Sequence, residues 1–141
     1  MEKIIVTIGM AGAGRATELH MEAYSRVKDI EPRYKSILAR NPEHAKAGKE
    51  RYGYEQTVSS FEEMLEDDEI QVIDICTPPY MHEEMIVQAL QAGKHVICEK
   101  PLAGYFGQSG DLEPIGTQVP KRRMYESLME SMEHIKSVVE S

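Results

Sequence analysis

Apolar residues along the first hundred positions of the chain gather in short runs, separated by longer segments of mixed polarity. The short runs are rich in β-branched residues, which predicts buried strands. The longer segments repeat an apolar residue every three or four positions, which predicts amphipathic helices. The predicted strands cover residues 4–8, 34–39, 55–58, 72–76 and 95–98, and the predicted helices cover 15–26, 42–52, 60–65 and 81–92.

Strands that alternate with helices of this length usually pair in parallel, because each helix returns the chain to the same end of the sheet. Local signals support the helix limits. Asn41 and Pro42 are typical of a helix start, and Gly53 is typical of a helix end. The sequence therefore predicts an α/β fold, a doubly wound parallel sheet with helices on both faces in three layers.

The chain changes character after Leu102. Residues 103–120 hold four glycines and two prolines without periodicity, which predicts a loop. Apolar residues at positions 124, 128, 132, 135 and 139 then predict a further amphipathic helix. We accordingly divide the chain into a domain at 1–102, a loop at 103–120 and a helix at 121–141. Such a helix normally leads into another strand, so we expect a longer protein whose second domain is absent here, and self-association through the uncovered apolar surface.

Composition narrows the class of protein. The chain has 141 residues, about the size of one domain, and a formal net charge of −8, which argues against nucleic acid as a partner. The two cysteines, Cys76 and Cys98, form no C-x-x-C pair and suggest reduced thiols. No apolar run approaches the length of a membrane span. We expect a cytoplasmic protein with no membrane partner.

The turn after the first predicted strand has the spacing of a dinucleotide-binding turn. Gly12 and Gly14 match the first two glycines of the G-x-G-x-x-G pattern, and Thr17 stands at the third. The first glycine makes the turn tight, and the second lets the backbone approach a pyrophosphate at the helix N-terminus. A glycine-rich turn after a strand can also be purely structural. We expect the cofactor to contact Gly9, Gly12, Gly14, Arg15 and Ala16.

The end of the second predicted strand bears on which dinucleotide binds. An acidic residue there would bind the adenosine ribose and repel a 2′-phosphate. The chain has Ala39-Arg40-Asn41 instead, which places a guanidinium where it can meet a phosphate. Arg40 can equally be a solvated loop residue. We expect NADP in preference to NAD, with Arg40 and Asn41 at the cofactor.

Two further segments follow the fourth and fifth predicted strands, whose carboxyl ends face the same crevice in such sheets. The first contains Thr77, Pro78 and His82, and the second contains Glu99 and Lys100. A lysine held beside a hydroxyl or carbonyl group can orient it or share its proton. The alternatives are a solvated Lys100 and a His82 that only starts a helix. No ligand spacing supports a metal site.

Four segments together carry a resemblance to a known family. They are the Gly12-x-Gly14 turn with His20 six residues later, Arg40-Asn41-Pro42-Glu43, Cys76-Thr77-Pro78-Pro79-x-x-His82, and the run from Ala92 to Leu102. Over residues 3–102 the chain resembles the N-terminal Rossmann-type domain of the glucose–fructose oxidoreductase / inositol dehydrogenase (Gfo/Idh/MocA) family. The Glu99-Lys100-Pro101 run is the most specific part of this likeness.

The resemblance implies a role for several residues. Thr77, Pro78 and His82 would border the nicotinamide half of the cofactor, Glu99 would contact the cofactor, and Lys100 would be the catalytic residue that polarises the reacting carbon–oxygen group. The chain departs from the family pattern at Thr17, Ala39 and Pro79. Members of the family are usually more than twice as long, so the resemblance implies that we should expect the substrate domain, with its acid/base histidine, beyond residue 141.

The leading hypothesis is therefore an NAD(P)-binding domain of an oxidoreductase that acts on a hydroxyl or carbonyl carbon of a sugar- or cyclitol-like small molecule. We expect the 141 residues to be inactive alone. An alternative is a standalone dinucleotide-binding regulatory module without redox activity. A complete small reductase is a weaker alternative, because no second acid/base residue is available.

Overall fold

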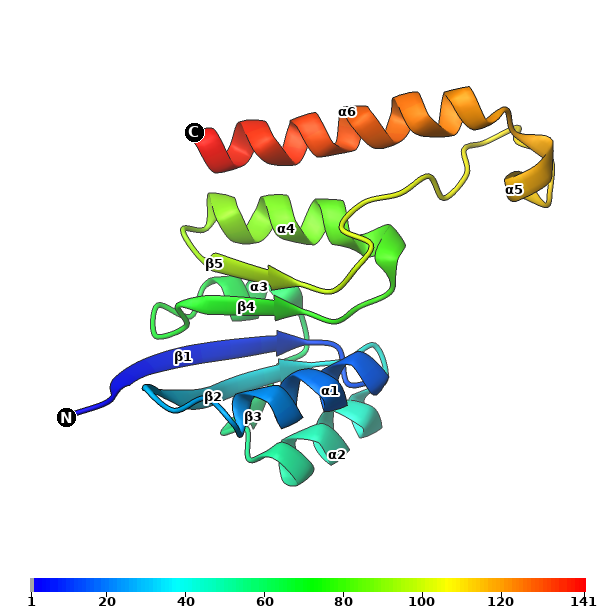
Figure 1. The fold of residues 1–141 in the computed structure, drawn as a ribbon. Coiled ribbons are helices and arrows are strands. Elements are labelled where there is room, and N and C mark those ends of the chain that lie inside the picture. The colour runs from blue at the N-terminus through cyan, green and yellow to red at the C-terminus, as the bar shows by residue number, and fades with distance from the viewer. Residues whose placement is uncertain (1) are drawn as a thin grey trace.

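The computed structural model describes residues 2–141 and confirms the α/β fold. Strands and helices alternate through the first hundred residues, and a long helix ends the chain (Figure 1). The strands are β1 (Ile4–Ala11), β2 (Ile30–Leu38), β3 (Gln56–Thr57), β4 (Val72–Ile75) and β5 (His95–Cys98). The helices are α1 (Arg15–Tyr24), α2 (Pro42–Tyr52), α3 (Phe61–Leu65), the 3₁₀ turn η1 (Pro79–Met81), α4 (His82–Gln91), α5 (Ile115–Gln118) and α6 (Lys121–Glu140).

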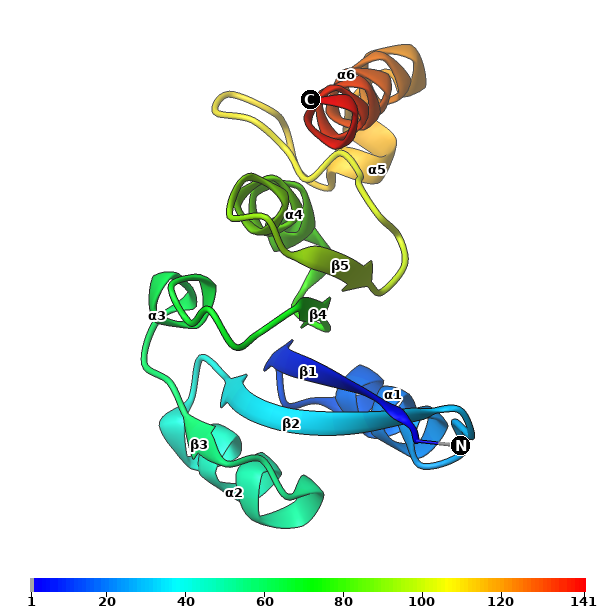
Figure 2. The ribbon, with the colours of Figure 1, turned by 90° about the vertical axis from the view of Figure 1, so that its left-hand side faces the viewer.

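The five strands form one parallel sheet in the order β3-β2-β1-β4-β5. The chain builds outward from β1 to β3 and then crosses back to β4 on the other side of β1. The strand order therefore reverses between β1 and β4, and ligands of doubly wound sheets bind at the carboxyl ends of the strands beside that point. Figure 2 shows helices on both sides of this sheet.

Alternating side chains of the central strands feed two separate cores. Met10 and Ile37 pack with Met21 of α1 on one face of the sheet. Ile73 and Ile75 of β4 pack with α3 and α4 on the other face. Asp74 lies between these two isoleucines in sequence, so its side chain points toward the face that α1 covers.

Two predicted strands are too short. β1 continues past Ile8 to Ala11, because Gly9–Ala11 pair with both β2 and β4. β2 begins at Ile30 rather than at Tyr34, since its first residues pair with the exposed start of β1. Both extensions arise from pairing with distant strands, which periodicity does not reveal.

The segment after β5 is held to the domain by α6, which packs along α4 (Figure 1). Ile135 of α6 is buried, whereas Tyr125 and Val139 are exposed. The preceding loop contains the short helix α5. Asp111 of this loop accepts a 2.8 Å hydrogen bond from the backbone amide of Gln108 and forms a 2.8 Å ion pair with Arg123. Self-association and the division at residues 102 and 120 stay predictions.

Within the described part of the chain, no helix is both long enough and apolar enough to cross a membrane. The cytoplasmic location stays a prediction.

Candidate functional site

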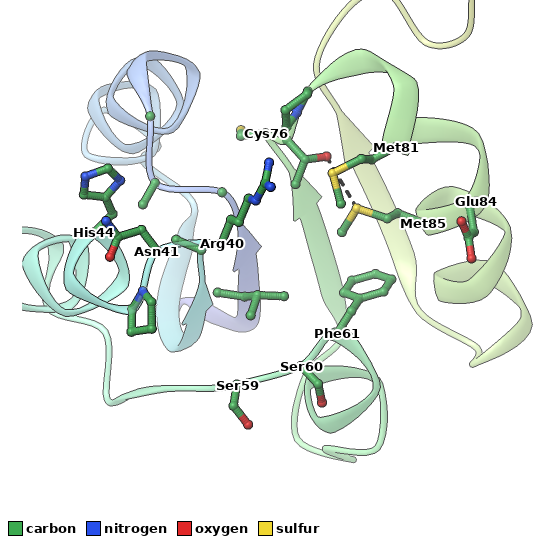
Figure 3. A pocket seen from close by; sticks show the side chains of 18 of the residues that line it. Arg40, Asn41, His44, Ser59, Ser60, Phe61, Cys76, Met81, Glu84 and Met85 are labelled. Carbon is green, nitrogen blue, oxygen red and sulfur yellow. Dashed lines mark hydrogen bonds between the residues drawn. The ribbon is translucent and has the colours of Figure 1, made fainter. Parts of the chain in front are cut away.

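A cavity of about 1440 Å³ opens at the carboxyl ends of β1, β2 and β4 (Figure 3). Its wall brings together three of the four segments that the sequence singled out. It is lined by the glycine turn, the residues that follow β2, the start of α3 and the segment from β4 into α4. Among the lining residues are Gly12, Gly14, Arg40, Asn41, Thr77 and Pro78.

The glycine turn is tight because Gly12 sits directly against β4. Gly12 has a φ of +111°, and a Cβ there would lie 2.5 Å from the carbonyl oxygen of Cys76. A side chain at this position is therefore excluded both by the backbone conformation and by the lack of room beside Cys76. Gly14, in contrast, has nothing within 4 Å of the position of a Cβ, so its backbone is open to a ligand. The tight turn at Gly12 is as the sequence predicted, and the approach of a cofactor to Gly14 stays a prediction.

Thr17 occupies the third glycine position without strain. Its side chain is fully buried, and its hydroxyl donates a 2.9 Å hydrogen bond to the carbonyl oxygen of Gly12. The departure from the glycine pattern therefore fastens the first turn of α1 to the loop before it.

The start of α1 differs from the starts of the next two helices. Asn41 caps α2 by accepting a bond from the amide of Glu43, and Ser60 caps α3 by accepting from the amide of Glu63. α1 begins at Arg15, and the residue before it, Gly14, has no side chain to cap it. The first amides of a helix have no acceptor within the helix, so those of Arg15 and Ala16 stay available to an anion.

Arg40 extends from the end of β2 into the space between β2 and β4 (Figure 3). It is exposed, and among residues 2–141 it forms no ion pair. Ala39 beside it offers no carboxylate. Asn41 lines the cavity, but its side-chain oxygen already accepts the hydrogen bond from Glu43 that caps α2.

His82 starts α4, as one of the two alternatives from the sequence has it, and its place beside the nicotinamide half of the cofactor stays a prediction. It is fully buried at the start of α4, and its ring nitrogens lie 2.8 Å from the carbonyl oxygen of Pro101 and 2.9 Å from that of Thr77. It does not line the cavity. His82 therefore ties the segment after β4 to the segment after β5, and we interpret its part in the site as one of support.

Glu99 and Lys100 lie at the end of β5, outside the cavity wall. The backbone amide of Lys100 donates a 2.8 Å bond to Oε1 of Glu99, and the Lys100 side chain is exposed. This bond is the main reason that the pKa of Glu99 is lowered, so Glu99 is a carboxylate at neutral pH.

A second group of polar side chains, which we call the Asp74 cluster, comprises His20, Tyr24, Asp74 and Cys76. The carboxylate of Asp74 is fully buried, and Nδ1 of His20 lies 2.9 Å from both of its oxygens. The hydroxyl of Tyr24 and the thiol of Cys76 also donate to Asp74. The sequence reasoning missed Asp74 and Tyr24. An acid inside an otherwise apolar strand was the available signal, because a buried charge requires partners.

The cluster holds its thiol and hydroxyl in their protonated forms. Burial, reinforced by the negative charge of Asp74, raises the pKa of Tyr24 and that of Cys76 well above their usual ranges. His20, Asp74 and Cys76 also have the atoms to bind a metal ion, since one potential ligand atom of each lies within 4.8 Å of those of the other two. Because these atoms already bond to one another and the thiol stays protonated, we interpret the group as a hydrogen-bonded cluster.

Comparison with known proteins now identifies the class of domain. Residues 6–113 match the model of the oxidoreductase family with an NAD-binding Rossmann fold. The chain belongs to this family. It is the glucose–fructose oxidoreductase / inositol dehydrogenase family that the motifs indicated.

Relatives in this family cover most of the chain but are much longer. Levoglucosan dehydrogenase of Pseudarthrobacter phenanthrenivorans is 36% identical over 104 residues, which are 70% of this chain and 27% of that protein. A 4-carboxy-2-hydroxymuconate-6-semialdehyde dehydrogenase of Sphingobium is 34% identical over 68% of this chain and 30% of its own length. The chain thus spans about three tenths of these oxidoreductases.

Solved structures agree with the family assignment. Levoglucosan dehydrogenase in complex with NADH superposes with a TM-score of 0.61 and 34% identity, covering 70% of this chain and 28% of that one. The match with the apo form of the same enzyme covers 98% of this chain and 32% of that enzyme, with 28% identity and a TM-score of 0.73. The match with the apo form extends over the region of α5 and α6.

Proposed function

We propose that this chain binds NADP(H), in preference to NAD(H), as the cofactor domain of an oxidoreductase that acts on a hydroxyl or carbonyl carbon of a sugar- or cyclitol-like molecule. The observation that carries the proposal is the open glycine turn. It joins an uncapped helix start to a cavity of about 1440 Å³, with free space above Gly14 where a phosphate can approach.

Each part of the site would hold one part of the cofactor. The amides of Arg15 and Ala16 would bind the pyrophosphate at the start of α1. The adenosine half would lie toward β2, because the residue at the end of that strand meets the adenosine ribose in such folds. The other half would then extend over β4 and β5, toward Glu99 and Lys100.

The nicotinamide ring of the bound cofactor supplies or accepts the hydride. Lys100 would orient the reacting carbon–oxygen group of the substrate and share its proton. Glu99 would contact the cofactor beside it, as the family resemblance implies. Complexes of levoglucosan dehydrogenase with NADH and levoglucosan are consistent with substrates of the sugar class. We expect little turnover from residues 1–141 alone.

The preference for NADP(H) rests on Ala39 and Arg40. A carboxylate at position 39 would repel a 2′-phosphate, and none is present. The guanidinium of Arg40 is exposed in the cavity and forms no ion pair within the described chain. It is thus free to pair with a phosphate.

The test is a fluorescence titration of NADPH and of NADH, which the absence of tryptophan in the chain makes straightforward. We expect NADPH to bind more tightly than NADH.

Arg40→Ala should weaken NADPH binding about tenfold or more, the scale of a hydrogen bond to a charged group, and leave NADH binding nearly unchanged. Ala39→Asp should reverse the preference. Arg26→Ala, an exposed arginine paired with Glu22, is the matched control. Equal affinities of the wild-type chain for both cofactors would reject the preference, and no binding of either at millimolar concentration would reject the proposal.

A further inference from the structure

The Asp74 cluster reaches the end of β5 through one side chain, His20. Its Nδ1 lies 2.9 Å from the buried carboxylate of Asp74, and its Nε2 lies 3.5 Å from Oε2 of Glu99. Exposure rises along this path, from 0% for the Asp74 side chain to 20% for His20 and 28% for Glu99. His20 thus connects the interior of the domain to the turn that carries Glu99 and Lys100.

Asp74 fixes the orientation of the His20 ring. The carboxylate belongs to a central strand and also accepts from Tyr24 and Cys76, so it has no freedom to move. Its position beside Nδ1 means that this nitrogen carries a proton and that Nε2 faces Glu99. The charged or titratable groups that face His20 are Asp74, Cys76, Tyr24 and Glu99.

Glu99 in turn holds the next residue. One of its oxygens faces His20, and the other accepts from the backbone amide of Lys100. The carboxylate therefore bridges the fixed imidazole and the Lys100 backbone. The ion-pair contact with His20 limits the orientations that Glu99 and the Lys100 turn can adopt.

We propose that His20 is a positioning residue, which holds Glu99, and through it the Lys100 turn, against the nicotinamide half of the cofactor, with Asp74 as its anchor. This inference rests on the proposed dinucleotide function. The proposal implies that the two halves of the cofactor depend on different residues, because we place the adenosine half toward β2, and neither His20 nor Glu99 lines the cavity there. Loss of His20 should therefore affect the whole dinucleotide but spare its adenosine half.

The experiment compares two ligands on the 141-residue chain, NADPH and adenosine 2′,5′-bisphosphate, which lacks the nicotinamide half. For His20→Gln we expect the Kd of NADPH to rise about tenfold, the equivalent of about 1.4 kcal/mol. The Kd of adenosine 2′,5′-bisphosphate should change less than about twofold. His134→Gln, an exposed histidine that pairs with Glu83 on α4, is the matched control and should change neither Kd.

Glu99→Gln provides a second variant on an exposed turn, and it should show the same split between the two ligands even if His20→Gln folds poorly. Because His20 acts through Glu99, the double variant should bind NADPH no more weakly than Glu99→Gln alone.

Three results would overturn the inference. His20→Gln or Glu99→Gln could weaken both ligands equally, they could weaken neither, or their losses could add in the double variant. A wild-type chain that binds neither ligand would instead overturn the proposed function, and this inference with it.

Discussion

The two flanks of the Gly12 turn are built in different ways. On the side of β2, the protein leaves an open cavity in which Arg40 is exposed without an ion pair in the described chain. On the side of β4 and β5, it packs three polar side chains around Asp74, which is fully buried. The flank on the side of β2, which we call the open flank, leaves Arg40 free, whereas the flank on the side of β4 and β5, which we call the closed flank, satisfies its polar groups internally.

This difference indicates which flank gains contacts from a ligand and which one supplies rigidity. Free groups such as Arg40 and the first amides of α1 can form new bonds to phosphate at no internal cost. The Asp74 cluster has its bonds already, so its contribution is to keep Glu99 in place. Rigid support of this kind is what a site needs for accurate geometry.

Removal of the Asp74 carboxylate should have the largest effect on stability. Asp74→Ala leaves Tyr24, Cys76 and His20 without their acceptor, and we expect the free energy of unfolding in urea to fall by about 4 kcal/mol. Asp68→Ala, at an exposed position before β4, should change it by less than about 0.5 kcal/mol. Equal effects of the two substitutions would show that the cluster is not a stabilising centre.

The turn between the two flanks offers a matched pair of glycines. Gly12→Ala places a Cβ against the Cys76 carbonyl at a positive φ. We expect the free energy of unfolding to fall by about 3 kcal/mol and cofactor binding to be lost. Gly14→Ala should cost less than about 1 kcal/mol, because its surroundings are open, and yet weaken NADPH by obstructing the phosphate. Urea unfolding and NADPH titration of both variants distinguish the role of Gly12 in the tight turn from the role of Gly14 in the approach of the phosphate. Similar losses of stability would contradict the assignment.

Alkaline pH should weaken the closed flank selectively. Burial raises the pKa of Cys98 to about 12 and also raises those of Cys76 and Tyr24, whereas in the unfolded chain these thiols and phenol ionise near pH 9 to 10. Groups with a raised pKa in the folded state stabilise it fully below the unfolded pKa, and this contribution disappears as pH rises. The urea midpoint should therefore stay level up to about pH 8 and fall as the pH rises from about 9 toward 12, and it should fall less in Cys76→Ala. An unchanged midpoint would mean that the thiols are not protected.

The open flank should show the smallest effect on stability. Asn41→Ala removes the side-chain cap of α2, which costs about 1 kcal/mol. Asn41→Ser should restore most of that loss, since serine also caps. NADPH affinity should follow Arg40 rather than Asn41, so a large loss of affinity in Asn41→Ser would assign a direct cofactor contact to Asn41.

Local features of the sequence predicted local parts of the structure well. The tight turn at Gly12, the cap at Asn41 and the end of α2 at Gly53 all depend on a few neighbouring residues, and all are confirmed. The parallel sheet also followed, because alternation of strand and helix leaves few other topologies.

Features that depend on distant residues were missed or misplaced. β1 extends to Ala11 through pairing with β4, more than sixty residues away along the chain. The hydrogen bond between Tyr24 and Asp74 joins residues 50 apart. His82 is buried because two carbonyls, one of them from Pro101, enclose its ring. None of these partners can be assigned from one sequence without knowing which elements meet.

The most direct test of the central claim is an NMR titration of the ¹⁵N-labelled chain with NADPH and, separately, with adenosine 2′,5′-bisphosphate. We expect both ligands to shift the amides of the Gly12–Ala16 turn and of residues 39–41. We expect NADPH alone also to shift Glu99 and Lys100. Shifts that map away from the carboxyl ends of the strands, or no saturable shifts with either ligand at millimolar concentration, would contradict that claim.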